Sequence, residues 1–117
     1  MPDAQQRVRV PIAPDHPAFA GHFPGQPLLP GVVLLAQAIE ALIQAPDCAA
    51  WVAAGASLGA VKFLAPVPPG ADLDVRWTTD PGRRRAHVEV WRLGPGDGTA
   101  GVLAATAQLQ APPEPVA

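Results

Sequence analysis

The chain has 117 residues, a mass of 12.1 kDa and a formal net charge of −2. Charged residues make up only 15% of it, and no basic run is interleaved with aromatic side chains, which excludes a protein that binds nucleic acid through charge. A single cysteine, Cys48, excludes an intramolecular disulfide and a multi-cysteine zinc site.

Length predicts one domain over residues 1–117, with a core at about 7–110 and an extended tail at 111–117. Its apolar residues include 23 alanines, so we expect a core built from small side chains. No run approaches the roughly eighteen apolar residues of a membrane span, and no basic and apolar leader opens the chain. We therefore expect a cytoplasmic protein that does not enter a membrane.

The first elements are a strand and a long loop. Residues 7–12 alternate polar and apolar, which predicts a short strand with one buried face, and Pro11 confines it to a sheet edge. Residues 13–30 are rich in proline and have no period, so we expect a loop. That loop carries four large apolar residues, which indicates that it packs onto the domain. They are Phe19, Phe23, Leu28 and Leu29.

Residues 31–45 have the spacing of one amphipathic helix that begins after Pro30. Its predicted apolar face consists of Val32, Leu35, Ala36, Ile39, Leu42 and Ile43. A narrow polar stripe is formed by Gln37, Glu40 and Gln44. Because the apolar arc is so wide, we expect a curving sheet or a partner subunit to wrap the helix.

After a connector at 47–56, the period changes to two. Strands are predicted at residues 57–64, 72–79, 84–93 and 99–110, separated by turns rich in Pro and Gly. In the second of these, Leu73, Val75 and Trp77 should point inward, while Asp74, Arg76 and Thr78 point outward. The order predicts an α+β protein in which a long antiparallel sheet wraps one helix, and the thin core favours a dimer.

Two features ahead of the helix suggest chemistry on an acyl thioester. His22 lies in a stiff loop of glycines and prolines, and an imidazole titrates near neutral pH. The Gly31 amide opens the helix, where backbone N–H groups are unsatisfied and the dipole favours negative charge. A base and an oxyanion donor are what enolisation of a thioester requires. Taken alone, however, a lone loop histidine is more often structural.

Two sequence blocks are far more specific. Residues 22–32 read HFPGQPLLPGV, and residues 61–73 read VKFLAPVPPGADL. The first block resembles the signature of the hot-dog-fold 3-hydroxyacyl-[acyl-carrier-protein] dehydratases, and the second is similar to the next strand and turn of that family. With the matching order of elements, the resemblance covers about residues 12–110 and favours the short, stand-alone members of specialised acyl pathways.

The resemblance implies a hot-dog fold, an antiparallel sheet around one long central helix, with active sites at a dimer interface. It makes His22 the catalytic histidine and Gly31 the donor to the thioester carbonyl. An apolar acyl channel would include Phe19, Phe23, Pro30 and Val32, with Leu28 and Leu29 beside them. No metal site is expected, and without a phosphate-binding glycine loop no cofactor is expected either.

One position departs from the family pattern. The family places a catalytic Glu or Asp six residues after the proline of the Pro-Gly pair, and this chain has Ala36 there. Glu40 lies one helical turn later, about 6 Å along the axis, on nearly the same face. Glu40 is therefore either a relocated acid or simply a member of the solvated polar stripe.

Three functions remain open at this point. The first is a dimeric dehydratase that acts on 3-hydroxyacyl thioesters of acyl carrier protein, less readily of coenzyme A. The second is a catalytically impaired, acyl-binding subunit that forms a hetero-dimer with a complete hot-dog chain. The third is a thioesterase on the same fold. The basic run Arg83–Arg85, with Lys62 and Arg76, is either a solvated hairpin or a docking patch for the acidic carrier.

Overall fold

The structure, a computed structural model, describes residues 5–19 and 28–113. Five strands form one antiparallel sheet in the spatial order β1-β3-β4-β5-β2. They are β1 (Gln6–Val10), β2 (Ser57–Phe63), β3 (Asp72–Asp80), β4 (Arg85–Leu93) and β5 (Val102–Gln110). The five strands expected from the sequence are thus confirmed, and β1 occupies an edge as Pro11 predicts.

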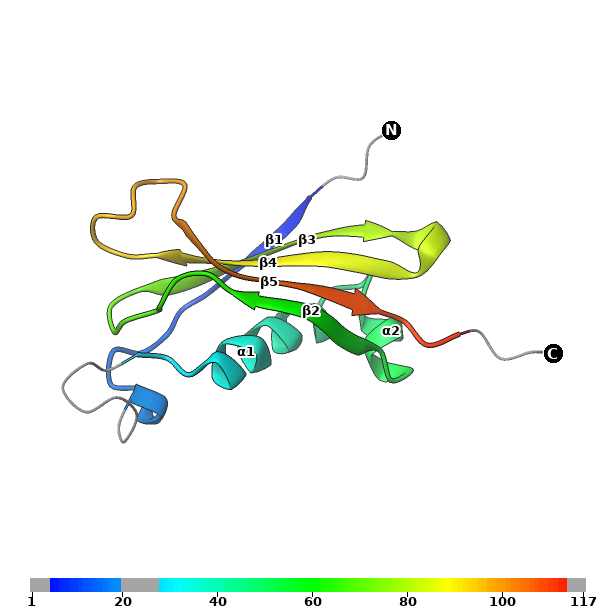
Figure 1. The fold of residues 1–117 in the computed structure, drawn as a ribbon, viewed down its shortest axis with the longest axis horizontal. Coiled ribbons are helices and arrows are strands. Elements are labelled where there is room, and N and C mark those ends of the chain that lie inside the picture. The colour runs from blue at the N-terminus through cyan, green and yellow to red at the C-terminus, as the bar shows by residue number, and fades with distance from the viewer. Residues whose placement is uncertain (1–4, 20–27, 114–117) are drawn as a thin grey trace.

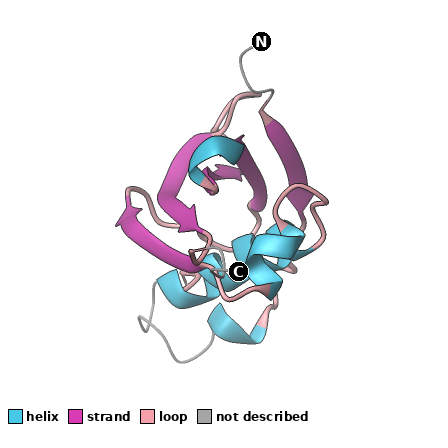
Figure 2. Cartoon of the chain, turned by 90° about the vertical axis from the view of Figure 1, so that its right-hand side faces the viewer, coloured by secondary structure: helices cyan, strands magenta, loops and turns pink. Residues whose placement is uncertain are grey.

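The main helix, α1 (Gly31–Ile43), runs beneath the sheet (Figure 1). The sheet is an arc with the helices on its open side (Figure 2), which confirms the expected α+β arrangement of a sheet curved around a helix. Two short 3-10 turns occur, η1 (Pro17–Phe19) and η2 (Pro81–Arg83). The connector also contains a five-residue helix, α2 (Ala49–Ala53), which is too short to show helical periodicity in the sequence.

Small side chains separate α1 from the sheet. On the helix, the buried positions are Leu34, Ala38, Ala41 and Leu42. The opposing strands contribute the buried valines and alanines Val75, Val88, Val90, Ala105 and Ala107. Small side chains thus line both sides of this layer, so the predicted small-residue core is observed.

The predicted apolar face of α1 was partly wrong. Val32 is 75% exposed and Ile43 is 46% exposed, whereas the core is reached by Leu34 and Ala38, which lie on the neighbouring arc. Val8 is 39% exposed too, because β1 lies at the sheet edge. When a helix is apolar nearly all round, tertiary packing determines which of its faces is buried, and sequence periodicity alone does not show this face.

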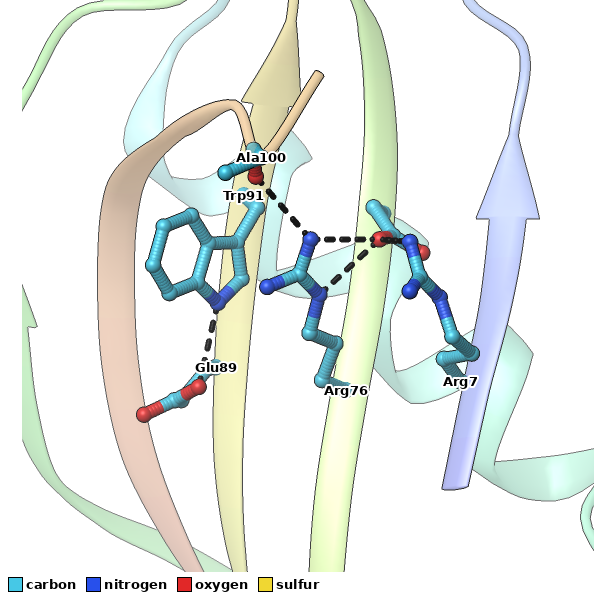
Figure 3. A network of polar contacts seen from close by, with 6 residues as sticks. Arg7, Arg76, Glu89, Trp91 and Ala100 are labelled. Carbon is cyan, nitrogen blue, oxygen red and sulfur yellow. Dashed lines mark hydrogen bonds and ion pairs between the residues drawn. The ribbon is translucent and has the colours of Figure 1, made fainter. Parts of the chain in front are cut away.

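Asp74 also departs from expectation. Leu73, Val75 and Trp77 point to the core as predicted, and Asp74 lies on the opposite face, yet Asp74 is only 1% exposed. Its carboxylate accepts hydrogen bonds from Arg7 and from Arg76, the latter at 2.9 Å (Figure 3). Arg76 stacks 4.3 Å from the ring centroid of Trp91 and donates to the Ala100 carbonyl at 3.1 Å. Two arginines and an indole therefore cover a charge on the outer face.

We expect the Asp74→Asn variant to lose about 3 kcal/mol of unfolding free energy, because it leaves the nearly buried guanidinium of Arg76 without a counter-charge. Chemical denaturation at neutral pH measures this loss. The matched control is Arg9→Gln, which breaks the exposed ion pair with Asp72 and should cost less than about 1 kcal/mol. Equal losses in the two variants would show that the Asp74 network contributes no more than a surface pair.

Candidate active site

An apolar groove of about 870 Å³ lies between the start of α1 and the end of β2. Three segments form it: the residues that lead into α1, the first turn of α1, and the stretch around and after Phe63. Its lining consists of Leu28, Leu29, Pro30, Gly31, Val32, Leu34, Leu35, Val61, Phe63, Leu64, Ala65, Pro66 and Val67. None of these side chains titrates, so the described lining is apolar and supplies no acid or base.

Backbone hydrogen bonds hold the groove walls together. The Leu29 N–H donates to the Val67 carbonyl at 2.8 Å, which joins the two sides. The Ala104 carbonyl accepts from the N–H groups of Leu64, at 2.8 Å, and Ala65, at 3.3 Å. Each wall is thus tied to a neighbouring segment rather than left as a free loop.

An ion pair anchors the same stretch from β4. Arg92 donates to the Pro66 carbonyl at 2.7 Å, and its guanidinium pairs with Asp97 at 3.1 Å. Asp97 in turn accepts from the Gly94 N–H at 3.0 Å. Arg92 therefore links the turn after β4 to the groove wall.

A bulge in β2 sets which side chains face the groove. Between Gly59 and Lys62 the pairing with β5 shifts register by one residue, and Ala60 has a φ of 51°. Without the extra residue, the face that begins at Leu58 would continue through Ala60 and Lys62. With it, Val61 and Phe63 line the groove.

The start of α1 gives the groove one polarised end. Pro30 has an extended backbone and provides no side-chain cap, and the first turn carries no acidic residue. The Pro30 carbonyl already accepts from Val33 and Leu34, both at 3.0 Å. The N–H groups of Gly31 and Val32 precede the first intrahelical hydrogen bond and lie at the positive end of the helix dipole. This end can therefore stabilise a developing negative charge.

Several residues expected in the site fall in different places. Pro30, Gly31 and Val32 all line the groove, whereas Phe19 is buried in the core at 7% exposure and is not among the lining residues. His22 and Phe23 lie outside the described residues. Leu28 and Leu29, which follow them in sequence, line the groove.

Ala36 and Glu40 lie on the exposed side of α1. Neither is among the groove-lining residues, and Glu40 is nine residues after Gly31, about 13 Å along the helix axis. Within residues 5–19 and 28–113, the Glu40 carboxylate forms no hydrogen bond or ion pair. Its side chain is exposed on this side of the helix.

The remaining histidines and the cysteine of the described residues have structural contacts or are buried. His16 Nδ1 accepts from the Ala18 N–H at 3.0 Å within its own turn, and His87 Nε2 lies 3.5 Å from Glu89. Burial, assisted by the neighbouring Asp47 carboxylate, raises the pKa of the Cys48 thiol to about 12, so at neutral pH it is not a thiolate nucleophile. In the part of the chain that the structure describes, no three His, Cys, Asp or Glu residues gather as metal ligands.

Phe63 is one of the groove-lining residues that sequence reasoning missed. Its ring fills the space beside Gly31, where a Cβ would lie only 2.7 Å from Phe63 Cζ. The signal was present, since Phe63 belongs to the second motif block, but a regular period from Leu58 places it on the other face of the strand. Only the bulge brings it to the groove.

The basic residues do not form one patch. The Arg76 side chain is only 12% exposed and contacts Asp74, Ala100 and Trp91. Arg76 is therefore not available for docking, contrary to the expectation that it belongs to a docking patch. On β5, the partner of Arg85 is Gln110 and the partner of Phe63 is Ala105. Five residues along a strand separate the Arg83–Arg85 hairpin from the groove by about 17 Å.

A family model matches most of the chain. Residues 2–97 match the model of the ApeI-like family, described as ApeI dehydratase. A 3-hydroxyacyl-[acyl-carrier-protein] dehydratase FabZ from Geotalea uraniireducens is 32% identical over 107 residues, covering 83% of this chain and 68% of the relative. The chain spans only about half the length of other curated FabZ relatives, 55% in two of them.

Solved structures share the fold. An uncharacterized protein from Erwinia carotovora has a TM-score of 0.70 and 27% identity, and the match covers 93% of this chain and 83% of that one. The dehydratase heterocomplex ApeI:P from Xenorhabdus doucetiae has a TM-score of 0.65 and 24% identity, over 92% and 87% of the chains. These matches confirm the expected hot-dog fold. Among the described residues, no helix has the length and apolarity of a membrane span.

Proposed function

Because the chain belongs to the ApeI-like dehydratase family, we propose that it removes water from a 3-hydroxyacyl thioester carried by an acyl carrier protein. The observation that carries the proposal is the apolar groove that ends at the uncapped start of α1. An acyl chain fits the apolar walls, and its thioester carbonyl fits the N–H groups at the end. The carrier is the one that the names of the curated relatives give.

In the proposed reaction, His22 removes a proton from the α-carbon of the substrate. The electron pair shifts toward the thioester carbonyl, whose oxygen accepts a hydrogen bond from the Gly31 N–H. As the enolate collapses, the α–β double bond forms and the bond between the β-carbon and its hydroxyl breaks. An acid protonates that hydroxyl, so that a 2-enoyl thioester and water leave the site.

We assign the acid to Glu40 of a second subunit. Ala36 stands where the family has a carboxylate, and the described groove lining carries none. Val32, Phe63 and Leu64 line the groove and are exposed, so a second subunit that closed its open side would contact them. Ile43, exposed further along α1, also suits a subunit interface. A homodimer or larger homo-oligomer would cover them. We also propose that the protein is cytoplasmic, where an acyl carrier protein can reach the groove without crossing a membrane.

The purified chain should convert a 3-hydroxybutyryl thioester of acyl carrier protein to the enoyl thioester, and hydrate a crotonyl thioester in reverse. Absorbance of the enoyl thioester follows the rate, and mass spectrometry identifies the products. Coenzyme A thioesters should react more slowly. Release of free carrier thiol without an enoyl product would instead assign the site to thioester hydrolysis.

A second candidate is a partner subunit, favoured by Ala36 alone. In this case the chain keeps the acyl groove but takes its acid from a different hot-dog chain in a hetero-dimer. One protein of the same fold is part of a dehydratase heterocomplex, so such pairing is compatible with the fold. It predicts that the isolated chain binds acyl carrier protein without turnover, and that adding a complete partner restores the reaction.

A further inference from the structure

The ring of Phe63 closes the polarised end of the groove on one side. A methyl group built on Gly31 would lie 2.7 Å from Phe63 Cζ and 2.9 Å from Cε1. Real Cβ atoms do not approach a ring so closely, so the space beside the Gly31 Cα is already filled. Gly31 has no positive φ, and glycine is therefore not needed there for backbone conformation. The tip of the neighbouring ring occupies the place that a Cβ would take, so an alanine at this position would force the ring to turn away.

Phe63 has a fixed backbone and a mostly free side chain. Before it, the bulge at Ala60 sets the direction of the strand, and after it the Ala104 carbonyl holds Leu64 and Ala65. The side chain is nevertheless 56% exposed, which is unusual for a phenylalanine at the end of a strand. The ring is thus positioned by its backbone rather than locked by core packing, and its exposed face looks into the groove.

We infer that Phe63 is the specificity-determining residue of this groove, restricting it to acyl thioesters that carry no substituent on the α-carbon. The inference rests on the proposed function and specifies its substrate class. We place the α-carbon of a substrate whose carbonyl oxygen accepts from the Gly31 N–H next to the space that the ring occupies. A methyl branch on that carbon meets the same ring that excludes a methyl group on Gly31.

The first test compares two substrates that differ only in this methyl group. The 3-hydroxybutyryl and 2-methyl-3-hydroxybutyryl thioesters both retain an α-hydrogen, so both can lose water. We expect Phe63→Ala to raise the kcat/KM of the branched substrate relative to the linear one by about tenfold or more. Val8→Ala is the control, since Val8 is an exposed apolar residue on β1 that does not line the groove, and its ratio should not change.

The two possible failures differ. If the wild-type protein converts neither substrate, the proposed function is wrong and the specificity role is overturned with it. If it converts the linear substrate and Phe63→Ala leaves the ratio unchanged, only the role of Phe63 is overturned. Whether the Phe63 ring contacts Gly31 is tested separately, by a stability measurement that needs no turnover.

The second test is suppression of Gly31→Ala. This substitution keeps the N–H, and alanine ordinarily favours a helix over glycine, so any loss of stability arises from the added methyl group. We expect Gly31→Ala to lower the Tm when Phe63 is present, to lower it less in the Phe63→Ala background, and to lower it by an unchanged amount in the Val8→Ala background. The coupling should amount to about tenfold in the unfolding equilibrium. Equal effects of Gly31→Ala with and without the ring would overturn the inference.

Discussion

The His22→Ala variant should lose dehydration and hydration activity by about a hundred- to ten-thousand-fold, the usual cost of removing a positioned base. The reason is that the described groove lining has no titratable side chain that could take the α-proton in place of His22. Initial rates with a crotonyl thioester measure the loss. KM should change much less than kcat, since the apolar lining that binds the acyl chain is retained.

The control for this variant is His16→Ala. His16 belongs to the same proline-rich segment, but its Nδ1 accepts from Ala18 within a local turn, and it is not among the groove-lining residues. His16→Ala should therefore lower stability slightly without a comparable loss of kcat. Full activity of His22→Ala would contradict the proposed mechanism, because the variant lacks the proposed general base.

Glu40→Gln should lower kcat by about a hundredfold or more if Glu40 is the acid, because glutamine keeps the shape of the side chain but cannot donate the proton. The measurement is again the rate with a crotonyl thioester, taken at protein concentrations where the oligomer persists. Gln44→Ala is the matched control, one helical turn further along the same polar stripe. It should leave kcat unchanged.

A compensating variant sharpens this result. Ala36→Glu restores a carboxylate at the position where the family has one, and Ala36 is exposed, so the longer side chain fits. Added to Glu40→Gln, it should recover a substantial part of the lost rate. If Glu40→Gln has no effect while Ala36→Glu activates an inert chain, the acid normally comes from a different protein and the hetero-dimer explanation is correct.

The strands and the helix could be predicted from the sequence because each has its own period and clear breakers at its ends. Val75 and Val88 alternate with polar neighbours, and Pro30 marks the start of α1. The alternation of polar and apolar residues did not predict which face of β2 carries a side chain where one extra residue shifts the alternation. The extra residue at Ala60 moves Phe63 to the groove, and neither composition nor spacing indicates a non-glycine residue with a φ of 51°.

Burial was harder to predict than secondary structure. Asp74 points away from the helix as its position in the strand requires, yet it is covered by Arg7, Arg76 and Trp91 from three different strands. That covering depends on register, which a sequence does not display. For the candidate site, Pro30, Gly31 and Val32 line the groove as predicted. The roles of His22 and Glu40 remain predictions.

The bulge in β2 also affects how the sheet can grow. β2 is an outer strand, and an outer strand with regular hydrogen-bonding groups is a template on which further chains can add. The kink at Ala60 interrupts that template after Gly59, so an approaching strand finds only short stretches in register. We therefore expect the irregularity that aims Phe63 at the groove to make this edge a poorer template for fibrils in a chain rich in alanine and poor in charge.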